Sequence, residues 1–296
     1  MYYFPKKKIF CLLLTICFLL VGCKNIPQGT SDFSASDSTD AQPLPNTSIP
    51  NAVPSETEDS EQTPPISPPS NVWDVSAIDT EYIQPQRKLI AFTFDDSPSR
   101  YSENLLSVFA SYNEHNPDCK ATASLFFNGG KFDADTPHLL YTACTLGLEL
   151  GNHTHSHANL TTLDENTLRR EIEQTDALLQ KADGTSHHLF RAPYGKINGL
   201  VKTVVATPII DWTIDTLDWS GVSEDSIYRT VLDNKFPGAI VLMHDGYPHT
   251  VDALKRLLPD LKAEGYQVVS VSAMAKAHGC VLKRGNVYIR ARKIEK

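Results

Sequence analysis

From residue 89 onward the chain alternates short apolar runs with amphipathic segments, and this alternation limits the folds available to it. Residues 89–94 and 239–242 are nearly continuous apolar runs, whereas residues 165–181 and 251–263 place apolar side chains at helical spacing. Apolar strands joined by helices are typical of a parallel sheet covered on both faces. Further short runs occupy residues 123–127, 148–150, 188–190, 209–210 and 268–271.

About seven such strand units favour closure, so the sequence predicts an α/β fold, a distorted (β/α) barrel with about seven parallel strands. An open doubly wound sheet is the alternative. Five of the apolar runs end in chemically capable side chains, and catalytic residues of such barrels gather at the C-terminal ends of strands. The sequence therefore predicts one composite active site, built from segments 94–96, 153–157, 191–195, 215–219 and 242–245.

A metal site is the sharpest expectation from the residues alone. His153 and His157 are four positions apart, so on a helical turn they would share one face, and His155 would point elsewhere. Two imidazoles and one carboxylate leave a coordination position open on an ion such as Zn²⁺, as in hydrolytic sites. The alternative is a pair of structural histidines. The carboxylates of Asp95 and Asp96 at another strand end favour the metal site.

Five ordered motifs carry a resemblance to a known family. They are Thr93-Phe-Asp-Asp96, Asn152-His-Thr-His-Ser-His157, Arg191-Ala-Pro-Tyr-Gly195, Asp215-Thr-Leu-Asp-Trp219 and Leu242-Met-His-Asp245. In this order the chain resembles the NodB-homology polysaccharide deacetylases of carbohydrate esterase family four, over about residues 89–274. The resemblance implies hydrolysis of acetyl groups on a glycan with a divalent metal, Zn²⁺ first, with Co²⁺ or Ni²⁺ as alternatives.

The resemblance also implies a role for each motif residue. The metal ligands would be Asp96, His153 and His157, and Asp95 would be the general base. Arg191 would keep Asp95 ionised, and the backbone N–H of Tyr194 would stabilise the oxyanion of the intermediate.

On the leaving-group side, the resemblance implies that His244 is the general acid. Asp215 would hold its imidazole and raise its pKa. Trp219, Leu242 and Pro193 would line a pocket for the acetyl methyl group. Asp218 and Asp245 are expected to be supporting hydrogen-bonding groups or helix caps.

One position departs from the family pattern. Gly commonly follows the Asp pair, whereas Ser97 stands here. If that Gly is needed for a positive φ, Ser97 is expected to be strained or to change the turn beside Asp95.

The N-terminal part has the layout of an export signal. Lys6, Lys7 and Lys8 precede the apolar residues 9–21, and the run ends in Leu20-Val-Gly-Cys23, which resembles a bacterial lipobox. We therefore expect a lipoprotein signal peptide over residues 1–22, a lipid on Cys23, and a disordered Pro/Ser/Thr-rich tether over residues 23–73. The catalytic domain is expected over residues 74–296, lipid-anchored on the extracytoplasmic face of the cell membrane. An uncleaved short anchor is the alternative.

Charge and cysteine content restrict the partners. The net charge of −8 argues against nucleic acid, whose binders need basic patches. Cys119 and Cys144 could form a disulfide outside the cell, or remain buried thiols. From the family resemblance and the expected anchor, we expect a monomer acting on an acetylated glycan, the amino sugars of peptidoglycan. Other hypotheses are deacetylation of poly-N-acetylglucosamine or chitin oligomers, an O-acetyl xylan esterase, and a glycan-binding lipoprotein without turnover.

Overall fold

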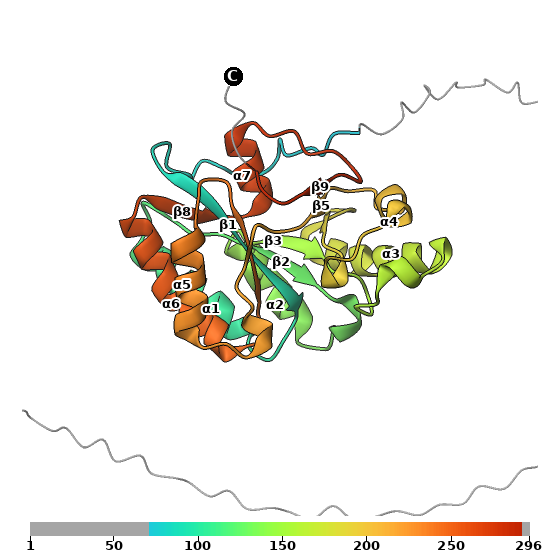
Figure 1. Ribbon diagram of the computed structural model, residues 1–296, viewed down its shortest axis with the longest axis horizontal. Coiled ribbons are helices and arrows are strands. Elements are labelled where there is room, and N and C mark those ends of the chain that lie inside the picture. Colours follow the sequence, from blue (N-terminus) through green and yellow to red (C-terminus); the bar gives the residue numbers. More distant parts are fainter. Residues whose placement is uncertain (1–70, 292–296) are drawn as a thin grey trace, which may run out of the picture. The chain divides into compact units, whose positions relative to one another are not determined.

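The computed structural model describes residues 71–291, and the strand β1 (Lys88–Ser97) lies at the centre of its sheet (Figure 1). Its apolar residues 89–92 are buried, as expected for a strand covered on both faces. The N-terminal half of β1 pairs with β8 (Tyr266–Val269), and its C-terminal half pairs with β2 (Ser124–Phe127) and β7 (Ile240–His244). All three ladders are parallel, so these strands end on the same side.

The other strands extend the sheet in the order β6-β7-β1-β2-β3-β4-β5-β9, again with parallel pairing. Several of them are only two residues long. Their bounds are β3 (Glu149–Asn152), β4 (Leu189–Phe190), β5 (Ile209–Ile210), β6 (Ile214–Asp215) and β9 (Val287–Tyr288).

The predicted distorted α/β barrel of parallel strands is confirmed, but its closure is irregular. Among residues 71–291, no ladder joins β6 to β9. Instead Ala239 forms an isolated antiparallel bridge with Arg290, and the N–H of Ala291 donates to the carbonyl of Gly238 at 3.0 Å. The segment after β9 therefore lies across the gap beside β7.

Helices follow most strands and cover the sheet. Helices α1, α5 and α6 lie together on one side, and α3 and α4 lie together on another (Figure 1). Asp164 caps α3 by accepting a hydrogen bond from the N–H of Thr167, and Gly184 ends that helix with a left-handed φ of 76°. The bounds are α1 (Ser102–His115), α2 (Thr136–Thr145), α3 (Glu165–Asp183), α4 (Gly199–Val204), α5 (Glu224–Asn234), α6 (Pro248–Ala263) and α7 (Val271–His278). Four short 3-10 helices are η1 (Gly129–Lys131), η2 (Leu160–Thr162), η3 (Pro193–Gly195) and η4 (Asp218–Ser220).

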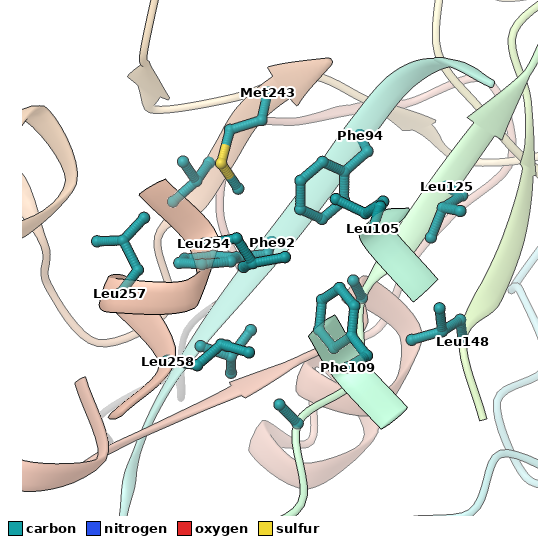
Figure 2. Close-up of a cluster of buried hydrophobic side chains, with 14 of the residues drawn as sticks. Phe92, Phe94, Leu105, Phe109, Leu125, Leu148, Met243, Leu254, Leu257 and Leu258 are labelled. Atoms are coloured by element: carbon teal, nitrogen blue, oxygen red, sulfur yellow. The ribbon is translucent and has the colours of Figure 1, made fainter. Parts of the chain in front are cut away.

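The largest part of the core lies between β1 and the helices α1 and α6. Phe94 of β1 meets Phe109 of α1 edge-on, with 6.2 Å between the ring centroids. Figure 2 shows how residues from β1, α1, β2, β7 and α6 fill this region, including Phe92, Leu105, Leu125, Met243, Leu254, Leu257 and Leu258. Burial of these side chains fixes β1, and with it the carboxylates at its end, relative to β7.

The folded region begins earlier than the sequence analysis placed it. Val72 bridges to Lys283, and the N–H of Trp73 donates to the carbonyl of Leu282 at 2.8 Å. These two residues, assigned to the tether, therefore belong to the fold. The predicted signal peptide, Cys23 and the tether up to residue 70 lie outside the described residues.

Two further expectations can be compared with the described residues, one on the cysteines and one on membrane-spanning helices. Cys119 and Cys144 are separate thiols, so the disulfide considered from the sequence is not formed. Within residues 71–291, no helix is both long and apolar enough to cross a bilayer.

Candidate active site

The predicted site residues meet at the C-terminal ends of the strands, around one cavity of about 450 Å³. Asp95 and Asp96 lie near the end of β1, His153 follows β3, and His244 ends β7. The structure thus brings residues of all five predicted segments together. The cavity is lined by Asp95, Asp96, His153, His157, Tyr194, Gly195, Trp212, Asp215, Trp219, Leu242 and His244.

Asp96, His153 and His157 form the group suited to hold a metal ion. One ligand atom from each lies within 4.8 Å of the others, with Asp96 Oδ1 3.5 Å from His157 Nε2 and 4.0 Å from His153 Nε2. His153 Nδ1 lies 2.9 Å from the carbonyl of Arg191. Because a carbonyl only accepts, Nδ1 carries the proton and the lone pair of Nε2 faces Asp96. Two imidazoles and one carboxylate in this arrangement fit Zn²⁺.

The local structure of this motif differs from the expectation of a helical turn. His153 follows β3 directly, and the next residues form a loop in which Thr154 and His157 have positive φ values of 70° and 57°. The loop returns His157 to the side of His153, with 5.0 Å between the ring centroids. His155 lies apart, as expected, and its carbonyl accepts a hydrogen bond from the N–H of Gly130 at 2.8 Å.

Electrostatics prepare both kinds of ligand for metal binding. Burial favours the neutral acid at Asp96, but nearby positive charge, including that of Lys131, outweighs burial and lowers the pKa of the carboxyl. Burial lowers the pKa of His153, which keeps its imidazole neutral. Lys131 was not identified from the sequence; its Nζ donates to the carbonyl of Asp96 at 2.8 Å.

Asp95 is held by the buried guanidinium of Arg191. Arg191 Nη1 donates to Asp95 Oδ1 and to Thr93 Oγ1, both at 2.7 Å, and Nε donates to the carbonyl of Ile210. Both charged side chains are at most 5 % exposed, so their ion pair is shielded from water. The bond to Arg191 therefore fixes the orientation of the Asp95 carboxylate, as a general base requires.

The carboxylate that supports His244 is Asp218, and the prediction of Asp215 was wrong. Asp218 Oδ1 lies 2.8 Å from His244 Nδ1, and Oδ2 accepts from the N–H of His244 and the hydroxyl of Thr250, both at 2.7 Å. Asp215 instead accepts from the N–H of Leu217 at 2.9 Å. Leu217 has a φ of 57° and turns the chain after β6, which brings Asp218 beside His244.

The environment of His244 favours its protonated form. Burial works against the charge, but the hydrogen bond that His244 donates to Asp218 and the nearby charge of Asp95 outweigh burial, so the pKa of His244 is raised. A histidine that stays protonated at neutral pH can act as a general acid.

The apolar wall of the cavity differs in part from the prediction. Trp219 and Leu242 line it as expected, whereas Pro193 is buried and is not among the lining residues. Trp212 lines it too, with Arg191 5.7 Å from its ring centroid, and was missed because it lies outside the five motifs. Tyr194 has a φ of 62°, and its ring centroid lies 4.7 Å from that of His157.

Ser97 does not carry the positive φ expected of it. That conformation falls on Asp96, with a φ of 70°, while Ser97 ends β1 and is buried. The hydroxyl of Ser97 donates to Asp245 Oδ2 at 2.8 Å, and Ser102 makes a shorter contact with the same oxygen. Burial raises the pKa of Asp245, which these hydroxyls oppose. Ser97 and Asp245 thus tie the ends of β1 and β7 together.

Comparison with known proteins agrees with this geometry. Residues 83–207 match a family model described as polysaccharide deacetylase. A peptidoglycan-N-acetylglucosamine deacetylase of Bacillus cereus is 36 % identical over 62 % of this chain and 67 % of its own length. The peptidoglycan-N-acetylmuramic acid deacetylase PdaC of Bacillus subtilis is 31 % identical over 66 % of this chain, which spans only 40 % of PdaC.

Solved structures give the same result. A structure described as T48 deacetylase with substrate has a TM-score of 0.63 and 29 % identity, covering 68 % of this chain and 96 % of its own. A family 4 acetyl xylan esterase of Clostridium thermocellum, in complex with a cobalt ion, has a TM-score of 0.63 and 25 % identity, covering 69 % of this chain and 98 % of its own. The chain belongs to the polysaccharide deacetylases of carbohydrate esterase family four.

Proposed function

We propose that this protein removes N-acetyl groups from the amino sugars of peptidoglycan. The observation that carries the proposal is the pairing of Asp95 with Arg191 and of His244 with Asp218, both beside the Asp96, His153 and His157 group. A protein that only binds glycan needs neither a supported base nor a supported acid. The relatives from Bacillus cereus and Bacillus subtilis, named for peptidoglycan substrates, support the choice of polymer.

The metal site would be filled by a divalent ion held by Asp96, His153 and His157, with Zn²⁺ the best fit and Co²⁺ or Ni²⁺ as alternatives. When bound, such an ion supplies Lewis-acid activation of water and of the acetyl carbonyl.

The protein's own residues would then move the protons. Asp95 accepts a proton from the attacking water, while Arg191 holds the carboxylate in place. The backbone N–H of Tyr194 donates to the oxyanion. His244 Nε2 gives its proton to the departing amine, because Nδ1 is engaged with Asp218. Trp219 and Leu242 lie beside the acetyl methyl group.

The state of His244 favours an amide substrate over an ester. An amine leaves only after its nitrogen is protonated, whereas an alkoxide leaving group depends less on a strong proton donor. The pKa of His244 is raised, chiefly by its hydrogen bond to Asp218 against the effect of burial, and this favours the protonated donor. Acetyl xylan is nevertheless the second candidate, because a family 4 acetyl xylan esterase shares the fold.

Acetate release separates these substrates. The Zn²⁺-loaded protein is expected to release acetate from purified peptidoglycan strands faster than from acetylated xylan or chitin oligomers. Mass spectrometry should find glucosamine or muramic acid residues that are about 42 Da lighter, because hydrogen has replaced the acetyl group. The Asp95→Asn variant is the control for contaminating activity. Release from xylan alone would replace the proposal with the esterase function, and no release from any of them would favour glycan binding.

We further propose that the protein is lipid-anchored at Cys23, outside the cytoplasm. An anchor about 50 residues before the folded region suits a polymer close to the membrane. Cys23→Ala is expected to move most of the protein from the membrane fraction to the soluble fraction and to slow precursor processing. Cys17→Ala, within the apolar run, is the matched control. Full membrane association of an uncleaved Cys23→Ala protein would support the short anchor instead.

A further inference from the structure

The loop that carries two of the proposed metal ligands has a strained backbone. Thr154 is β-branched, yet its φ is 70°, and His157 has a φ of 57°. Such conformations persist only when surrounding contacts hold them. The N–H of Thr154 donates to Asn152 Oδ1 at 2.8 Å, and the N–H of His157 donates to Thr154 Oγ1 at 3.1 Å. The side chain of Asn152 is thus the first support of the loop.

Asn152 is itself held by a buried carboxylate. Its Nδ2 donates to Asp176 Oδ1 and to the carbonyl of Ile172, both at 2.9 Å. An anionic carboxylate only accepts, so it fixes which end of the amide is the NH₂ group. The oxygen of Asn152 must then face the N–H of Thr154. If the amide were reversed, its NH₂ group would face the N–H of Thr154, and neither group could accept a hydrogen bond from the other.

His188 completes the network. Its side chain is 2 % exposed, with Nδ1 2.9 Å from Asp176 Oδ1 and Nε2 3.2 Å from Asp183 Oδ2. A carboxylate at each ring nitrogen requires both to donate, so His188 is an imidazolium. Burial opposes this charge, but the hydrogen bonds to Asp176 and Asp183 raise the pKa of His188 to about 9. The charged His188 thereby holds the Asp176 carboxylate in position.

We propose that Asn152, Asp176 and His188 are positioning residues that set the metal affinity of the site by holding the loop between His153 and His157. The inference rests on the proposed metal site. It adds Asp176 of α3 and His188, which directly precedes β4, and neither of them lies in the five motifs; Asn152 belongs to the second motif. Supporting groups of this kind change metal affinity by about 10- to 100-fold when they are removed.

The test compares His188→Gln with His187→Gln. Glutamine keeps one donor but lacks the charge, and His187 is a matched control because its side chain is half exposed and lies 3.6 Å from Asp176 Oδ2. Zn²⁺ affinity is measured by competition with a chromogenic chelator, without substrate. We expect His188→Gln to weaken Zn²⁺ binding about 10- to 100-fold, with kcat restored to near the wild-type value at saturating Zn²⁺, and His187→Gln to bind as the wild type does.

A purely structural role would give a different result. A lower Tm of the apoprotein with an unchanged Kd for Zn²⁺ in His188→Gln would overturn the proposal. If that variant does not fold, Asp176→Asn serves instead, because it removes the charge at constant size; an unchanged Kd there would equally overturn the proposal. An error in the proposed glycan would leave the Zn²⁺ affinities unaffected, since they are measured without substrate.

Discussion

Exchanging Asp95 for Asn is expected to lower kcat by about 10²- to 10⁴-fold, the contribution typical of a general base, while the protein keeps its metal. Asn has nearly the shape of Asp but cannot accept a proton from water, and Arg191 can still donate to its amide oxygen. Elemental analysis of the purified variant and initial rates of acetate release at saturating Zn²⁺ measure the two effects separately.

The corresponding exchange at the neighbouring aspartate, Asp96, provides the control. Asp96→Asn removes an anionic ligand, so we expect it to lose the metal along with activity. The comparison is informative because distance alone does not separate the two carboxylates: Asp95 Oδ2 lies 3.6 Å from His153 Nε2, and Asp96 Oδ1 lies 4.0 Å from it. Asp95 is distinguished by its bond to Arg191. Metal loss in Asp95→Asn, with retention in Asp96→Asn, would reverse the two roles.

The fold was predictable where the strands are long and apolar. Residues of β1, β2, β7 and β8 are buried on both faces, and this requires the continuous apolar runs seen in the sequence. Strand β9 was missed because it has two residues, both half-buried, within a segment of basic character. Its pairing with β5 depends on tertiary contacts that no local pattern records.

The sequence indicated which residues would come together at the site better than how the backbone would bring them together. The four-residue spacing of His153 and His157 correctly indicated a shared ligand group, but a loop with positive φ brings them together in place of a helix. Asp218 was passed over because its motif holds two aspartates close together, Asp215 at the end of β6 and Asp218 three residues later. The left-handed turn at Leu217 decides between them, and a leucine gives no sequence signal for that conformation.

Replacing Asp218 by Asn is expected to have two effects on the pH dependence of kcat. The alkaline limb should move to lower pH, and kcat should fall about 100-fold. The rate should fall as His244 loses its proton. In the wild type the pKa of His244 is raised, because the bond to Asp218 and the charge of Asp95 outweigh burial, so the limb lies above the usual range of histidine. With Asn, Nδ1 loses its anionic partner while burial still opposes the charge, and the pKa falls.

Asp215→Asn is the matched control, since Asp215 lines the same cavity while its carboxylate accepts a hydrogen bond from the N–H of Leu217. Its alkaline limb should stay where the wild-type limb is. The position of a limb does not depend on the fraction of folded protein, so a loss of stability in Asp218→Asn cannot imitate the shift. If the limb moved in Asp215→Asn and stayed in Asp218→Asn, Asp215 would be the partner of His244 during turnover, and the turn at Leu217 would have to rearrange when substrate binds.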